Sequence, residues 1–127
     1  MLNSIRLLLV SCCFVQAAFA ADDVIPDISG EWVVNSSVGG ETPITVHCTL
    51  EQNEFDLTGT CTPEMENAET SALTGSVTST SASWGYDVVF NSEPGRVDFL
   101  ATSLMANRLS GTLSLSGTEA PFTAERR

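Results

Sequence analysis

From Ile28 onward, apolar and polar residues alternate in short runs rich in Thr, Ser and Val, and turn-forming residues separate these runs. Alternation of this kind is typical of a β-strand with one buried face, because successive side chains of a strand point to opposite sides. No segment has the helical period of an amphipathic α-helix. The pattern predicts eight strands, near residues 30–35, 43–51, 55–62, 71–78, 81–90, 95–104, 107–115 and 120–126.

Eight short strands at regular spacing favour a single small antiparallel up-and-down β-barrel, because closing the sheet removes the exposed edges on which strands aggregate. A two-sheet sandwich is the alternative. An apolar residue followed two positions later by Gly recurs along the chain and supports the barrel, because Gly permits the sharp coiling of a narrow sheet. These glycines are Gly30, Gly59, Gly75 and Gly111.

The first twenty residues have the features of a cleavable signal peptide. Arg6 precedes an apolar stretch, Leu7 to Phe19, and Ala18-Phe19-Ala20 offers small residues for cleavage. The stretch is too short to span a bilayer as a helix, so we expect an exported protein, periplasmic or secreted. A lipoprotein anchored through Cys12 is the minor alternative. The expected organisation is a signal peptide (1–20), an N-terminal segment (21–27) and a β-barrel domain (28–127).

Two cysteines follow the signal peptide, and the alternation directs both inward. The apolar face of the second strand holds Ile44, Val46, Cys48 and Leu50, and that of the third holds Phe55, Leu57, Gly59 and Cys61. A hairpin that turns at Asn53-Glu54 brings Cys48 and Cys61 nearly opposite each other, as a cross-strand disulfide requires. Export supplies an oxidising compartment, so we predict this bridge.

The chain is strongly acidic, with a net charge of −11 and no Lys. Nucleic acids and anionic membrane surfaces are therefore poor partners. Acidity in an exported protein is most simply a source of solubility. A cation site or a basic partner surface is the alternative explanation.

The motif Gly30-Glu31-Trp32 and the closing run Phe122-Thr123-Ala124-Glu125-Arg126 resemble the signature of calycin-type barrels, the group that contains lipocalins and avidins. The resemblance extends over residues 30–126 and is closest to small bacterial exported domains of that type. It implies that Trp32 lies across one end of the barrel and that Arg126 packs over it, as a barrel-closing structural pair.

A second resemblance is to bacterial inhibitors of secreted zinc metalloproteases, which are exported barrels of the same type. It rests on Ser29-Gly30-Glu31-Trp32, on His47-Cys48 and on Cys61. It implies that the N-terminal segment, here Ala21 to Pro26, inserts into the protease cleft. The acidic residues of this segment and the closer spacing of the cysteines depart from those inhibitors.

The sequence lacks an evident catalytic constellation. His47 is the only histidine, and the alternation that buries Cys48 places it outward. No second His or free Cys is available for a nucleophile pair or a common zinc site. Glu64, Glu66 and Glu69 cluster in one loop, but their spacing lacks the ligands and central Gly of a calcium loop, which favours a solvated turn. We therefore expect no enzyme activity, no metal and no cofactor.

Aromatic residues offer the better functional candidate. Trp84, Tyr86, Val88 and Phe90 share one face of a predicted strand and can line an apolar pocket at a barrel mouth. The simpler interpretation is that they fill the barrel, because an eight-stranded barrel is just wide enough for its own side chains or one small ligand. The register of the sixth strand stays open, with either Val97, Phe99 and Ala101 or Leu100, Thr102 and Leu104 inward.

These observations favour a non-enzymatic exported β-barrel that acts as a binding or accessory module for a small apolar ligand or a secreted protein partner. An inhibitor of a secreted zinc metalloprotease, acting through its N-terminal segment, is the alternative function.

Overall fold

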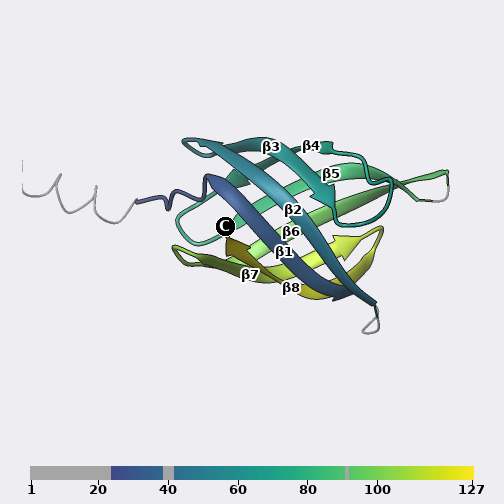
Figure 1. Ribbon diagram of the computed structural model, residues 1–127. Coiled ribbons are helices and arrows are strands. Elements are labelled where there is room, and N and C mark those ends of the chain that lie inside the picture. Colours follow the sequence, from purple (N-terminus) through teal and green to yellow (C-terminus); the bar gives the residue numbers. More distant parts are fainter. Residues whose placement is uncertain (1–23, 39–41, 91) are drawn as a thin grey trace, which may run out of the picture.

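The computed structural model describes residues 24–38, 42–90 and 92–127. It is an all-β structure in which eight antiparallel strands close into one barrel, each paired with its neighbours in the chain and the last paired with the first (Figure 1). The strands are β1 (Gly30–Val38), β2 (Thr42–Asn53), β3 (Asp56–Pro63), β4 (Ser71–Val77), β5 (Ala82–Phe90), β6 (Glu93–Leu104), β7 (Arg108–Leu115) and β8 (Thr118–Arg126).

The predicted eight strands and the up-and-down barrel are confirmed, and the sandwich alternative is wrong because β1 pairs with both β2 and β8. Strand ends differ from the predicted ones by up to three residues. The largest difference is in β1, where pairing with β2 continues to Val38. No helix of the described segments is long and apolar enough to span a membrane. The predicted signal peptide and Cys12 lie outside the described residues.

The β2–β3 hairpin has its turn one residue later than predicted. Asn53 pairs with Asp56, so Glu54 and Phe55 form the turn, with Glu54 in the left-handed region at a φ of 58°. The prediction that Phe55 faces inward is wrong, because its side chain lies in this turn and is 58% exposed. The shift places Cys48 directly opposite Cys61.

The sixth strand uses the first of its two predicted registers for most of its length. Val97, Phe99 and Ala101 are buried, whereas Leu100 is 47% exposed. The pairing with β7 then shifts between Ala101 and Ser103. This β-bulge turns Leu104 back toward the core, where it packs against the buried cluster.

The inward side chains form one continuous hydrophobic core. At its centre Trp84 stacks on Phe99 with ring centroids 5.1 Å apart, and Phe122 meets Phe99 edge-on at 5.3 Å. Close approach of the strands depends on glycines. A Cβ atom at Gly59 would lie 1.9 Å from the Thr49 carbonyl oxygen, a contact that no side chain can make.

Candidate functional site

One end of the barrel is closed by Trp32 and Arg126. The indole of Trp32 is 0% exposed, and its Nε1–H donates to the Ile28 carbonyl at 3.0 Å. The guanidinium carbon of Arg126 lies 4.5 Å from the centroid of the Trp32 ring, a cation–π arrangement. Ile28 is 1% exposed and belongs to the same core. These side chains therefore fill this end of the barrel.

Arg126 also ties the strand ends to the chain that leads into β1. Its Nε–H donates to the Ala106 carbonyl at 2.9 Å, and its Nη1 donates to the Ser29 carbonyl. Ser29 N–H donates to Asp27 Oδ1 at 3.0 Å, and this bond lowers the pKa of the Asp27 carboxyl. The closed end is thus held by hydrogen bonds as well as by apolar packing.

The described part of the N-terminal segment lies against the barrel. Gln52 Oε1 accepts a bond from Ile28 N–H at 2.9 Å, and Gln52 Nε2 donates to the Pro26 carbonyl at 3.0 Å. Ile25 packs against the core, and Val24 is 64% exposed. Residues 21–23 of the segment that resembles the inhibitors lie outside the described residues, so the structure describes only residues 24–26 of that segment.

The disulfide between Cys48 and Cys61 is present, with an S–S distance of 2.01 Å. Both residues are buried, so the predicted staple is confirmed. A structural disulfide fits a protein exported to an oxidising compartment. Cys61 lies two residues before the end of β3, so the bridge also anchors the loop that follows.

That loop, residues 64–70, is held by further contacts near its base. His47 Nε2 lies 2.8 Å from Glu64 Oε2, and Arg127 Nη1 lies 3.4 Å from His47 Nδ1. Because an arginine only donates, Nδ1 accepts and Nε2–H donates to Glu64. At the other end of the loop, Thr62 Oγ1 and Thr70 Oγ1 lie 2.7 Å apart. His47 was expected to be outward and solvated. It does face outward, but it carries a partner from the loop.

The opposite end of the barrel is open on one side. Residues Thr74 to Val77 of β4 pair with Ala82 to Gly85 of β5, and the pairing stops there. β5 continues to Phe90 while paired only with β6. The β5–β6 hairpin therefore projects past the start of β4 (Figure 1). The wall of the barrel is split between this hairpin and the loop 64–70.

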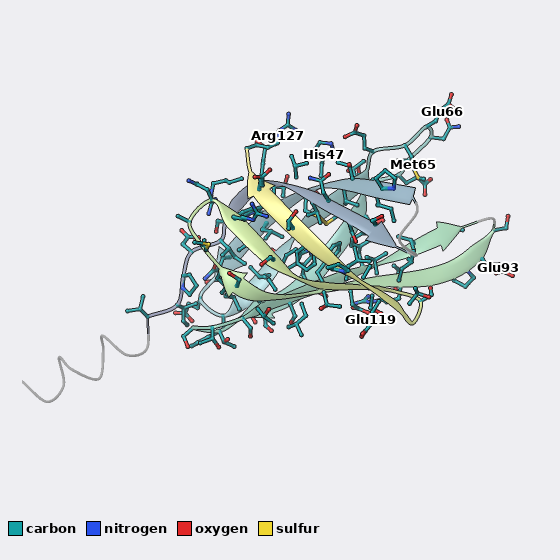
Figure 2. The ribbon with its side chains drawn as sticks, turned by 90° about the horizontal axis from the view of Figure 1, so that it is seen from below. His47, Met65, Glu66, Glu93, Glu119 and Arg127 are labelled. Atoms are coloured by element: carbon teal, nitrogen blue, oxygen red, sulfur yellow. A yellow bond between two sulfur atoms is a disulfide. The ribbon has the colours of Figure 1, made fainter. Side chains whose placement is uncertain are left out.

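A cleft of about 570 Å³ lies between the two parts of the wall. Its walls carry apolar side chains from both sides, including Met65 from the loop and Val88 and Val89 from β5, with Glu69 and Asp87 beside them. Figure 2 shows Met65 and Glu66 on the loop and Glu93 on the hairpin at the same end of the barrel. We call this space the open-end cleft; it is lined by Pro63, Met65, Asn67, Ala68, Glu69, Ser71, Asp87, Val88, Val89, Pro94 and Gly95.

The predicted aromatic face divides between the core and the open-end cleft. Trp84 and Tyr86 are each 2% exposed and belong to the core, and burial raises the pKa of Tyr86 to about 12. Trp84 Nε1 is buried with no hydrogen-bond partner in the described part of the chain. Val88 is half-buried and lines the open-end cleft. The side chain of Phe90 lies outside the described residues.

The three glutamates of the loop do not converge. Glu64 pairs with His47 and Glu69 lines the open-end cleft, and all three glutamates are exposed. Within residues 24–38, 42–90 and 92–127, no group of three or more His, Cys, Asp or Glu side chains is arranged to hold a metal ion.

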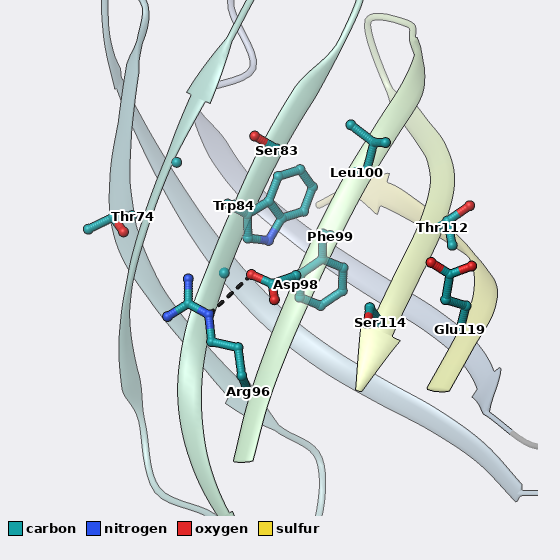
Figure 3. A pocket seen from close by; sticks show the side chains of 12 residues that line it. Thr74, Ser83, Trp84, Arg96, Asp98, Phe99, Leu100, Thr112, Ser114 and Glu119 are labelled. Atoms are coloured by element: carbon teal, nitrogen blue, oxygen red, sulfur yellow. Dashed lines mark hydrogen bonds and ion pairs between the residues drawn. The ribbon is translucent and has the colours of Figure 1, made fainter. Parts of the chain in front are cut away.

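A second, shallower groove of about 390 Å³ lies over β4 to β8 (Figure 3). Arg96 crosses part of it and donates to Asp98 at 3.1 Å and to Asp87 at 3.3 Å. The bond to Asp98 raises the pKa of Arg96. This cation is therefore already paired twice, and the groove is lined by hydroxyl, aromatic and charged side chains, with Leu100 as an exposed apolar residue.

The sequence pattern predicted that Val88 can line a pocket at a barrel mouth, but it did not reveal the split in the wall that forms the open-end cleft. The pairing of β4 with β5 stops at Gly85. This point cannot be predicted from the alternation of apolar and polar residues, because the alternation continues regularly before and after it. The excess length of the predicted strand 81–90 over its predecessor 71–78 was the one available signal. Searches against models of known protein families and against curated proteins found no match to this chain.

Proposed function

We propose that this protein is a non-enzymatic, exported, calycin-like barrel that acts as a binding or accessory module and takes its partner in the open-end cleft. The observation that carries the proposal is the contrast between a packed interior and a split wall. Trp84, Phe99 and Phe122 occupy the barrel centre in mutual contact. A ligand inside the barrel would have to displace them.

The size and composition of the open-end cleft support this assignment. Binding sites for small molecules and peptide segments are usually concave, mostly apolar and several hundred Å³ in volume, with a few polar groups that fix orientation. The open-end cleft has that volume, and it has exposed apolar walls in Met65 (59% exposed) and Val89 (69% exposed). Its loop wall is held in place by the disulfide and by the His47–Glu64 contact.

The metalloprotease-inhibitor alternative receives less support. It requires a free N-terminal segment, but Gln52 binds Pro26 and Ile28, and Ile25 packs against the core. It remains a prediction from the resemblance and has its own test. Failure of the intact protein to inhibit any secreted metalloprotease would remove it.

Site-specific photo-crosslinking tests the proposal. A photoreactive phenylalanine analogue is placed at Val89 in the open-end cleft or at Phe55 at the closed end, two positions of similar exposure at 69% and 58%. In cells that export the protein, we expect a discrete adduct from position 89 and none from position 55. Adducts from both positions, or from neither, would contradict the proposal.

Apolar fluorescent probes test the competing location inside the barrel. A probe that enters the interior should change the emission of the buried tryptophans and raise the melting temperature. We expect neither change across a panel of such probes. A clear response would move the binding site from the open-end cleft to the interior.

A further inference from the structure

Resting on the proposed function, we propose that the open-end cleft binds an extended, basic segment of a partner protein, which adds to the free edge of β5 as an extra strand. The edge is the first observation. β5 pairs with β6 along its whole length, from Ala82 to Phe90, but with β4 only as far as Gly85. The backbone from Tyr86 to Val89 thus has a neighbouring strand on one side only within the described residues.

A free strand edge is a template for another strand, because it presents a row of unpaired N–H and C=O groups. The open-end cleft runs along this edge and is lined by Asp87, Val88 and Val89 of β5. Ala68 and Glu69 of the loop and Ser71 at the start of β4 also line the open-end cleft. An added strand would therefore lie between β5 and the loop and continue the barrel wall that β4 leaves incomplete.

The charges at the open-end cleft select the kind of strand. Glu69 and Asp87 line the cleft, and Glu66 and Glu93 project at the same end (Figure 2). Arg96, a cation near them, is paired with Asp87 and Asp98. The chain as a whole carries a net charge of −11. A second copy of this chain would meet like charge at this edge, whereas a segment rich in Lys or Arg would find complementary charge.

Apolar contacts complete the recognition. Side chains of an added strand point alternately to the two faces of the sheet. Val88 is half-buried and faces the interior side, whereas Val89 is 69% exposed on the outer side. We therefore expect the partner segment to alternate basic and apolar residues over about four positions, the length of the free edge from Tyr86 to Val89.

The binding test uses a seven-residue peptide in which Lys and Val alternate, with both ends capped, and the intact disulfide-bonded protein. Two control peptides separate the contributions. In one, Glu replaces Lys. In the other, every backbone nitrogen is methylated, which keeps every charge but removes strand hydrogen bonds on both edges of the peptide. We expect binding of the first peptide, none of the Glu peptide, and at least about tenfold weaker binding of the methylated peptide, since each hydrogen bond contributes a severalfold change in affinity.

Variants and exchange place the peptide on β5. Glu69→Gln should weaken binding about two- to fivefold, as expected for one exposed ion pair, and Glu51→Gln on the outer face of β2 should leave it unchanged. Bound peptide should slow amide hydrogen exchange in the stretch from Tyr86 to Val89. Equal affinity for the methylated peptide, or no new protection on β5, would overturn strand addition.

The outcomes distinguish this proposal from the broader one. If crosslinking at Val89 succeeds but the methylated peptide binds as well as the unmodified one, the open-end cleft is the binding site and strand addition is wrong. If the peptide binds with protection of β5 but position 89 gives no adduct in cells, the proposed function fails. A concentration-dependent dimer in sedimentation, with protection on β5, would identify a second copy as the occupant and overturn the basic partner.

Discussion

The two ends of this barrel differ in how completely they are closed. At the closed end, Trp32 fills the lumen, Arg126 covers it, and Gln52 binds the incoming chain. At the open end, β5 and β6 extend beyond β4, and a loop held by a disulfide and a histidine contact stands apart from them. The closed end satisfies its polar groups internally, whereas the open end leaves one edge of β5 without a neighbouring strand among the described residues. The first arrangement contributes to stability, and the second leaves the surface that we propose binds a partner.

The largest effect should come from removing the closure itself. Trp32→Ala deletes a fully buried indole, its hydrogen bond and the cation–π contact, and should lower the free energy of unfolding by about 3–5 kcal/mol. Val88→Ala at the open end should cost about 1 kcal/mol, because that side chain is only half-buried. Urea denaturation followed by circular dichroism measures both. Equal losses would show that the two ends contribute alike.

The disulfide should have the next largest effect. It closes a loop with a sequence separation of 13, for which chain entropy predicts a stabilisation of about 3 kcal/mol. The double substitution Cys48→Ala and Cys61→Ala avoids leaving a buried thiol and should lower the free energy of unfolding by that amount. The same variant should speed amide exchange at Glu64, whose N–H donates to the Thr45 carbonyl at 2.8 Å. Unchanged exchange there would mean that the bridge does not fix the loop.

Removing one polar anchor of the closed end should have a smaller effect. Gln52→Ala leaves the buried Ile28 N–H without its acceptor and frees the Pro26 carbonyl, which should cost about 2 kcal/mol. Glu51→Ala, an exposed neighbour on the outer face of β2, is the matched control and should cost much less. Thermal denaturation compares the two. A loss confined to the control would contradict the role of Gln52.

What could be predicted from the sequence differs between the ends for a physical reason. Period-two alternation depends on burial of one face, so it revealed the strands and the inward pair Cys48 and Cys61. It failed at Phe55, because an apolar residue in a tight turn continues the pattern without being buried. The Trp32–Arg126 arrangement was anticipated from a resemblance to calycin-type barrels. The open-end cleft arises from where pairing stops between β4 and β5, which depends on relative strand lengths and the path of a loop.

The pKa of Tyr86 reports whether water reaches the core through the open end. It lies two residues before Val88, yet burial raises its pKa to about 12. An unfolded tyrosine titrates near 10, so the folded state holds this proton more tightly. Stability should be complete below about pH 10 and fall as the pH rises toward 12, by at most about 1.4 kcal/mol per pH unit.

Tyr86 is the only tyrosine and the chain has no Lys, so tyrosinate absorbance and the alkaline stability profile report this group directly. Tyr86→Phe should abolish the decline between pH 10 and 12. A measured pKa near 10 would mean that water reaches the ring through the split wall, so that the opening between β4 and β5 continues into the core. A value near 12 would confine the opening to the surface, where a partner strand can close it.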